Sequence, residues 1–493
     1  MDNHPDPRTL HRLAFGIAAL AILARLWMAW ATRSTGEDFL ITLRYAENIA
    51  HGQGFVFNPG ERVLGTTTPL YTLLLALFAF LHLNADLCGK LGNILADGVT
   101  CYLLARLLAR PEIQRPIAGL FAALLYALSS TPLSISIGGM ETGLVTCVGM
   151  GMITAYIARQ TRPIYLLGAI LFLLRVDGLL LFLLLAAASA LRDRRLPWQD
   201  CILFLLLLLP WLTFAFLYFG SPVPTSLIAK LLVYAKSLVV PRSLILDAFA
   251  TQFISGAFQK LLTLLFLVGA FLTPRLHKGL GVPLLWLLLY YGVMLTSRVP
   301  AFAWYFLPPW PLFLGIAALG GNALLTGIGG KLTQTSHIAT LWLPVLALVG
   351  LYGLVHLRSV RADIANNQWQ ETNLRVPMGL WFRDHAKPNE RILLEPIGYV
   401  GYYSQRPILD MIGLVSPEVF PSYHKPDFLA DIVTRLRPEW LCLRPGERDR
   451  LQRQNPALPD AEYTYVHAFQ LPSRPVDFLV YHRKQDSAPN IAQ

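Results

Sequence analysis

Long apolar runs are the feature that most constrains what this chain can fold into. They recur at close to the roughly 20 residues that a helix needs to cross a bilayer, in a sequence of 493 residues that is 54% hydrophobic and only 14% charged. The first run, Leu13 to Ala31, is followed by polar residues without a small-residue cleavage pattern. We therefore interpret it as a retained span and not as a removed signal peptide. The sequence predicts a polytopic α-helical membrane protein.

The basic residues lie mainly in short segments between the apolar runs and toward the C-terminus. The net charge of +11 is here a sign of topology and not of nucleic-acid binding, because Lys and Arg favour the cytoplasmic side of a membrane. Placing the basic clusters inside predicts about eleven spans, a cytoplasmic N-terminus and an external C-terminus. The clusters are Arg8/Arg12, Arg106/Arg110/Arg115, Arg159/Arg162, Arg192/Arg194/Arg195 and Arg275/Lys278.

Two apolar runs do not fit this topology as full spans. Thr66 to Leu83 would place the Arg106 to Arg115 cluster outside if it crossed, so we expect it to lie in or near the outer interface, before a second true span at Leu87 to Leu108. Ile164 to Leu191 must leave and return to the cytoplasm within about 28 residues, too few for two full spans. It predicts a hairpin of two short helices turning at Arg175 to Gly178.

From Arg358 onward the apolar runs shorten to strand length, as in RILLE, WLCLR and DFLVYH, with turn residues between them. We therefore divide the chain into two domains. Residues 1–357 form a transmembrane domain, whose first external loop with its juxtamembrane helices covers residues 32–83. Residues 358–493 form an external α/β domain.

Charged residues converge on the predicted outer face from five separate segments. Charges at or within the membrane boundary are costly, so several that meet from different helices indicate a functional site. The segments are Glu37/Asp38, Met140/Glu141, Arg175/Asp177, the loop Gly220 to Gln252 with Lys230, and Arg298 to Tyr305.

The same residues also have structural interpretations. Asp38 to Ala50 has the spacing of an amphipathic interfacial helix, which Thr35 can cap and whose first turn favours carboxylates. Glu141 likewise stands at a helix start, and Arg175 with Asp177 can form an internal ion pair. From the residues alone, a helix start and a catalytic site are both open for the paired acids.

A longer motif joins these segments. The stretch EDFLITLRYAENIAHGQGFVFNPGERVLGTTTPLYTLLLA, from Glu37 to Ala76, resembles the first external loop of bacterial GT-C superfamily glycosyltransferases of the terminal-arabinofuranosyltransferase-like and ArnT-PMT-like kinds. Counterparts of later family motifs follow in order: Gly139 to Thr142, Arg175 to Gly178, Pro224 to Lys230 and Arg406 to Val415. The chain departs from the family pattern in having Glu37-Asp38 for Asp-Asp, Val176 for Pro, and Trp304-Tyr305 for Arg-Tyr.

The resemblance implies an enzyme that moves a sugar from a polyprenyl-phosphate donor, such as an undecaprenyl phosphate sugar, to a hydroxyl of a cell-envelope glycan, glycolipid or protein. The transfer would occur on the outer face of the bacterial cytoplasmic membrane, with membrane lipids as further partners and no nucleic acid. Such chemistry needs a base for the acceptor hydroxyl and cations for the departing phosphate.

The implied roles fall on three groups of residues. Asp38 is the predicted base, with Glu37 as its alternate and Glu141 as a second acid. The predicted phosphate-binding residues are Lys230, Arg175 and Arg298, with Tyr305 as a hydrogen-bond donor. The predicted substrate-binding residues are Arg44, Tyr45, Asn58, Asp177 and Asp410.

The sequence requires no cofactor, because it contains no Gly-rich nucleotide motif and no Asp-x-Asp metal signature. A divalent cation bridging carboxylates and phosphate stays open. The alternative functions are a lipid transporter or flippase and an enzyme like an O-antigen polymerase or ligase. The lack of an inverted repeat argues against the first, and the acid-rich first loop argues against the second.

Overall fold

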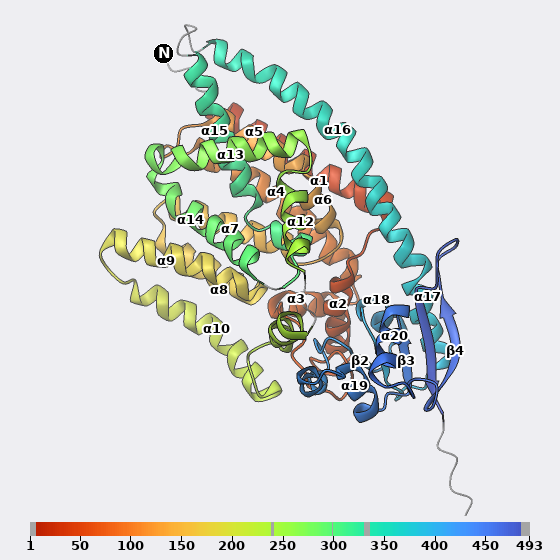
Figure 1. Cartoon of the computed structure of the whole chain (residues 1–493). Coiled ribbons are helices and arrows are strands. Elements are labelled where there is room, and N and C mark those ends of the chain that lie inside the picture. Colours follow the sequence, from red (N-terminus) through yellow and green to blue (C-terminus); the bar gives the residue numbers. More distant parts are fainter. Residues whose placement is uncertain (1–5, 238–240, 298, 330–335, 485–493) are drawn as a thin grey trace, which may run out of the picture.

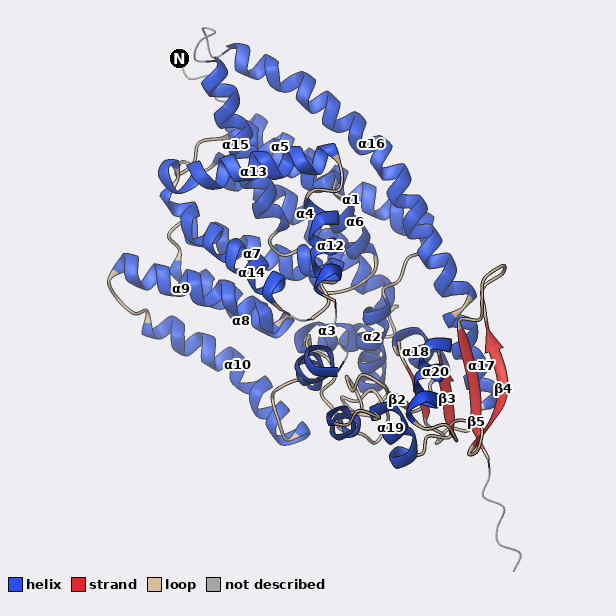
Figure 2. Cartoon of the chain, in the orientation of Figure 1, coloured by secondary structure: helices blue, strands red, loops and turns tan. Residues whose placement is uncertain are grey.

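The computed structural model describes residues 6–237, 241–297, 299–329 and 336–484. Helices form most of it, and the five described strands gather in one sheet at one end of the molecule (Figure 2). The helices of the first half of the chain are α1 (Pro7–Thr32), α2 (Glu37–Ala50), α3 (Pro69–Phe80), α4 (Ala85–Ala109), α5 (Pro116–Leu128), α6 (Ser130–Ile137), α7 (Thr142–Ile157), α8 (Thr161–Leu174), η1 (Val176–Gly178), α9 (Leu179–Asp193) and α10 (Trp198–Phe219).

The helices that follow lead to the sheet. They are α11 (Thr225–Ala229), the π-helix η2 (Lys230–Ser237), α12 (Arg242–Phe253), α13 (Ala257–Leu276), η3 (Lys278–Leu280), α14 (Gly281–Thr296), η4 (Ala303–Phe306), α15 (Trp310–Gly329), α16 (Ser336–Asn373) and α17 (Arg375–His385). Helix α16 runs along one side of the bundle, beside α1, down to the sheet (Figure 1). The predicted domain boundary at residues 357/358 lies within this helix.

The C-terminal part is a mixed sheet with helices. Its elements are β1 (Ile392–Leu394), α18 (Gly398–Ser404), β2 (Ile408–Asp410), η5 (Pro417–His424), α19 (Phe428–Leu436), β3 (Trp440–Leu443), α20 (Pro445–Gln454), β4 (Tyr463–Phe469) and β5 (Phe478–Arg483). The strand order is β2-β1-β3-β5-β4. Strand β1 pairs in parallel with β2 and β3, whereas β5 pairs antiparallel with β3 and β4. The three strands predicted from RILLE, WLCLR and DFLVYH are β1, β3 and β5.

The protein is a multi-pass membrane protein. In the described ranges, five helices are long and apolar enough to cross a membrane, or six if the bent pair α5 and α6 counts as one span. The second predicted span is α4, and the run at Thr66 to Leu83 forms only the 12-residue α3. The predicted hairpin forms as α8 and α9, joined at Val176–Gly178. Because helices of 14 to 16 residues fall short of a full crossing, the count of about eleven spans stays a prediction.

A buried ion pair fixes the bent α5 and α6 pair against α1 and α4. Arg25 and Asp97 are both fully buried and bonded to each other. Asp97 also accepts hydrogen bonds from the Tyr126 hydroxyl at 2.7 Å and from Ser136, and Arg25 donates to the Ala127 carbonyl at 3.0 Å. Removing one partner of such a pair costs about 3–5 kcal/mol. Because Tyr126 on α5 and Ser136 on α6 both donate to Asp97, the same cluster holds these two helices in place.

Helix α2 departs from the predicted interfacial helix in its surroundings. Its bounds are close to the predicted range, but residues on all its sides are buried, including Phe39, Leu40 and Ile41 in succession. The helix packs on α3 and on α18, and its place relative to the membrane interface stays a prediction. Thr35 does not cap it. The N-cap is Gly36, and the Thr35 hydroxyl accepts a hydrogen bond from Lys90 instead.

Candidate active site

A cavity of about 540 Å³ lies where α2, the corner between α6 and α7, the hairpin turn, η2, η4 and the C-terminal sheet meet. Its walls come from chain segments far apart in the sequence. These segments meet because the C-terminal part packs against the end of the helical bundle that carries α2 and α3 (Figure 1). Seven of the predicted site residues line it: Glu37, Asp38, Glu141, Arg175, Lys230, Tyr305 and Asp410.

The two adjacent acids have different surroundings. The Glu37 carboxylate accepts hydrogen bonds from the backbone N–H groups of Gly398 and Tyr399, the second at 3.3 Å, and lies 3.5 Å from Arg375. Burial raises the pKa of Glu37 to about 7, although Arg375 opposes the shift. Glu37 therefore joins the start of α2 to the C-terminal part.

Asp38 lines the cavity. In the part of the chain that the structure describes, no hydrogen-bond donor reaches that carboxylate. Burial raises the pKa of Asp38, Lys230 lowers it, and Glu395 raises it. A half-buried carboxylate without a partner is unusual, because buried polar groups are normally hydrogen-bonded. Of the two acids, Asp38 is the one available to a bound molecule.

Arg175 is held by two carboxylates. Its guanidinium donates to both oxygens of Asp177, at 2.7 and 3.0 Å, and lies 3.6 Å from Glu141. Asp177 also accepts a hydrogen bond from the Tyr290 hydroxyl at 3.2 Å, and it is not among the residues that line the cavity. Asp177 as a substrate-binding residue therefore stays a prediction. Its carboxylate orients Arg175, as in the structural interpretation of the turn.

Lys230 and Tyr305 form the other cationic part of the wall. The Lys230 ammonium donates to the Tyr305 hydroxyl at 2.7 Å, and the Tyr305 ring also lies 5.3 Å from the Arg175 guanidinium carbon. Lys230 is the first residue of the π-helix η2, a rare geometry that is frequent at functional sites. No carboxylate of the described residues lies within ion-pair distance of Lys230. Arg298 lies outside the described residues.

Three other predicted substrate-binding residues do not line the cavity. Arg44 donates to the backbone carbonyls of Gly401 and Arg406, both at 2.8 Å. Asn58 exchanges hydrogen bonds with the backbone of Ile408 at 2.8 and 2.9 Å, and Tyr45 donates to the Val63 carbonyl at 2.8 Å. These side chains bind backbone groups in the structure, and their substrate-binding role stays a prediction. Arg44 and Asn58 join the segment after α1 to the C-terminal part.

Asp410 lines the cavity but is engaged in its own loop. Its carboxylate accepts hydrogen bonds from the backbone N–H groups of Ile412, Leu414 and Val415. It therefore shapes the loop after β2, which covers one side of the cavity.

The sequence interpretation missed three charged residues in the cavity wall. Arg375, Glu395 and Arg444 reach it from the C-terminal part. Arg375 pairs with Glu37 and with Glu371, and Arg444 pairs with Glu395 at 2.6 Å and with Glu447 at 2.9 Å. Nothing in the local sequence marks these residues, because their place in the site depends on how the sheet packs against α2.

Within residues 6–237, 241–297, 299–329 and 336–484, no group of three or more His, Cys, Asp or Glu side chains is placed to hold a metal ion. The side chains of these residues therefore do not match a metal site made by the protein alone.

The helical bundle with its C-terminal sheet matches the GT-C membrane fold of ArnT. The chain aligns with the structure of ArnT from Cupriavidus metallidurans in the apo state with a TM-score of 0.64 and 11% identity, over 94% of this chain and 96% of that one. It aligns with the same protein bound to undecaprenyl phosphate with a TM-score of 0.57 and 12% identity, over 94% and 97% of the two chains.

Among proteins of known function, the chain is similar to the terminal beta-(1->2)-arabinofuranosyltransferase of Mycobacterium tuberculosis (strain ATCC 25618 / H37Rv). The two are 29% identical over 252 residues, which is 44% of this chain. The match covers only 38% of the relative's length. A family model described as a domain of unknown function, DUF8728, matches residues 362–487. The resemblance to GT-C glycosyltransferases predicted from the motifs is confirmed.

Proposed function

We propose that the chain is a membrane glycosyltransferase that moves a sugar from a polyprenyl-phosphate donor to a hydroxyl of a cell-envelope glycan, glycolipid or protein. One observation carries the proposal. Asp38, a carboxylate without a hydrogen-bond donor, and Lys230, a cation without a carboxylate partner, line one cavity of about 540 Å³ in the described part of the chain. A base and a phosphate-binding cation are the two groups that glycosyl transfer from a sugar phosphate requires.

In the proposed reaction, the acceptor oxygen forms a bond to the anomeric carbon of the sugar. The bond between that carbon and the phosphate oxygen breaks, and its electron pair stays with the lipid phosphate. The acceptor proton passes to Asp38, for which a pKa raised by burial is favourable at neutral pH. Lys230 and the Tyr305 hydroxyl meet the new charge on the phosphate, with Arg175 beside the Tyr305 ring. Glu141 holds Arg175 in place.

The comparisons support the class of donor. One of the two ArnT structures is bound to undecaprenyl phosphate, and the similar mycobacterial protein is named for transfer of an arabinofuranosyl group. We infer a polyprenyl phosphate carrying a pentose or a hexose as the donor for this chain. We further infer that the site faces the outer side of the bacterial cytoplasmic membrane, with residues 1–357 as the transmembrane domain, residues 358–493 outside and the N-terminus inside.

The proposal is tested with the purified full chain in lipid nanodiscs. Synthetic polyprenyl-phosphate arabinose and polyprenyl-phosphate hexoses, each radiolabelled in the sugar, are supplied with extracted cell-envelope glycans, and the label in the glycan fraction is measured. We expect transfer from one donor, its loss in Asp38→Asn, and its retention in Asp384→Asn, an exposed aspartate on α17. Transfer is expected to survive a chelator. Lipid movement without cleavage of the sugar phosphate bond would contradict the proposal and favour a flippase.

A further inference from the structure

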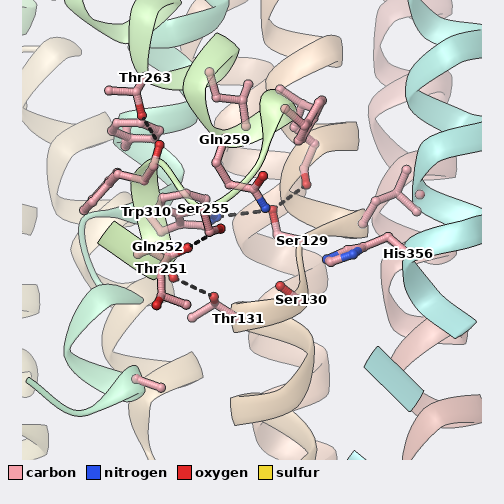
Figure 3. Close-up of a pocket in the computed structure, with 18 residues that line it drawn as sticks. Ser129, Ser130, Thr131, Thr251, Gln252, Ser255, Gln259, Thr263, Trp310 and His356 are labelled. Atoms are coloured by element: carbon pink, nitrogen blue, oxygen red, sulfur yellow. Dashed lines mark hydrogen bonds between the residues drawn. The ribbon is translucent and has the colours of Figure 1, made fainter. Parts of the chain in front are cut away.

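A second cavity of about 400 Å³ lies beside the catalytic one. Its walls come from the break between α5 and α6, the segment joining α12 to α13, the start of α15, and α16 (Figure 3). The backbone at Ser129 is extended between the two helices, which meet at 52°. Irregular backbone at membrane depth is tolerated where it lines a cavity or is buried in protein.

The two cavities share two walls. On α6, Ser130 and Thr131 line the second cavity and Ser134 and Ile135 line the catalytic one, so one helical turn, about 5.4 Å, separates the two sets. In the segment before α15, Ala303 lines the second cavity, while both of its neighbours in the chain line the catalytic one. A molecule in the second cavity therefore lies next to the catalytic cavity.

One side of the second cavity is aromatic. The rings of Trp310 and Phe313 stack with centroids 4.9 Å apart and planes 9° apart, and Phe253 lies 5.2 Å from Phe313. The Trp310 indole N–H is directed into the polar side by its hydrogen bond to the Ser129 hydroxyl at 3.2 Å. Phe313 also stacks on Phe266, so this side offers a ligand the edges of packed rings. Apolar surface beside hydrogen-bonding groups suits a ligand with both C–H surfaces and hydroxyl groups.

The other side is polar and uncharged. Half of the 18 lining residues are Ser, Thr, Gln or His, and none of the 18 is Asp, Glu, Lys or Arg. In Figure 3, the Gln259 and His356 side chains point toward Ser129 at the helix break. Gln252 accepts from Thr131 at 3.1 Å through its amide oxygen. Its amide nitrogen, like the whole Gln259 amide, has no hydrogen-bond partner within the described residues.

The side chains that line the second cavity determine which class of ligand it can bind. A hydrocarbon tail in the cavity would leave the two amides without partners, which is costly for groups removed from water. A phosphate would lack any cation to meet its charge. We propose that the second cavity binds an uncharged, hydroxyl-rich part of the acceptor, a neutral sugar unit, and holds it beside the Asp38 cavity. That this sugar unit belongs to the acceptor rests on the proposed function. That the cavity binds a neutral sugar does not.

The experiment measures binding without turnover. The full chain in nanodiscs is titrated with octyl glucoside below its micelle concentration, and with octyl phosphate and octanol as matched probes, by native mass spectrometry. Hydrogen exchange of residues 251–263 locates the binding. We expect the glucoside alone to bind and protect this segment. We expect the variants Gln252→Leu and Gln259→Leu each to weaken it about tenfold or more, as loss of one or two hydrogen bonds predicts.

Gln199→Leu, at an exposed glutamine near the start of α10, is the matched control and should bind as the unaltered chain does. Equal binding of octanol or octyl phosphate, or glucoside binding unchanged in both glutamine variants, would overturn the inference. In the transfer assay, the two variants should raise the acceptor KM and leave the donor KM unchanged. Sugar binding that depends on the two glutamines without any transfer would refute the proposed function and leave the second site standing.

Discussion

Replacing each of the adjacent acids by its amide separates a chemical role from a structural one. Asp38→Asn keeps the size of the side chain and removes the group that takes the acceptor proton. General-base catalysis contributes about 10²–10⁴-fold, which corresponds to about 3–5 kcal/mol of activation free energy at roughly 1.4 kcal/mol per tenfold. Because no donor binds the Asp38 carboxylate in the described structure, the free energy of unfolding should change little. We therefore expect a folded protein with at most about 1% of the original rate.

Glu37→Gln should give the opposite result. The amide oxygen can still accept the N–H of Gly398, but the ion pair with Arg375 is lost. Both side chains of that pair are about one fifth exposed, so the pair is worth about 1 kcal/mol or less. We expect a transfer rate within about tenfold of the original and almost unchanged stability at low pH, where Glu37 is itself protonated and makes no ion pair.

The stability difference between the unaltered protein and the variant depends on pH because the pKa of Glu37 is raised. Since the folded pKa, about 7, lies above the ordinary value of 4.5, the folded state binds the proton more tightly than the unfolded state. The stabilisation from this group is complete below about pH 4.5 and is lost as the pH rises through about 7. Thermal unfolding should therefore show the Glu37→Gln variant gaining on the unaltered protein between about pH 5 and about pH 8. Loss of transfer in folded Glu37→Gln, together with retained transfer in Asp38→Asn, would refute the assignment of the base.

The remaining predictions concern the electrostatics of the base and the attachment of the sheet. Activity should fall as the pH drops through the pKa of Asp38, which gives the pH profile an acidic limb. Lys230 lowers that pKa and Glu395 raises it. The acidic limb should therefore move to higher pH in Lys230→Met and to lower pH in Glu395→Gln. Shifts in the same direction, measured as transfer rate against pH, would contradict the assignment. Gly398→Ala should reduce both stability and transfer, because a Cβ there would overlap the Glu37 backbone carbonyl. Gly446→Ala, in open space on α20, is the control and should leave both intact. Equal effects of the two variants on thermal unfolding would show that the contact at Gly398 is unimportant.

Much of the fold could be predicted because it follows from local patterns. Helix α4 covers the predicted second span at Leu87 to Leu108, and the charged hairpin turn forms between α8 and α9. Strand β2 was not predicted, since a strand of three residues depends on its neighbours in the sheet more than on its own sequence. Helix α16 continues past the end of the apolar sequence. A helix is maintained by backbone hydrogen bonds, so a change in hydropathy does not mark its end.

The candidate site was predictable only in part, because local sequence does not determine which distant segments a side chain contacts. The motifs locate residues along the chain, and seven of those residues share one cavity. A motif does not say what each side chain contacts. Arg44 and Asn58 lie in the most specific motif, yet they bind the backbone of the C-terminal part. Arg375 and Arg444 carry no local signal and still reach the cavity, because only the packing of the sheet brings them there.

The charge balance of the cavity explains why one lysine and one acid stand out. Of the four cations that line it, Arg175, Arg375 and Arg444 are each paired with two carboxylates, and in the described residues only Lys230 has none. In the proposed reaction, Asp38 loses its negative charge on taking the proton, and the lipid phosphate gains one when the sugar leaves. The total charge in the cavity is therefore unchanged, and one negative charge moves from Asp38 toward Lys230. A preorganised cation at the point where charge develops lowers the barrier without further reorganisation. The Glu37 contact with the C-terminal part fixes the start of α2, and thereby keeps Asp38 facing that cation.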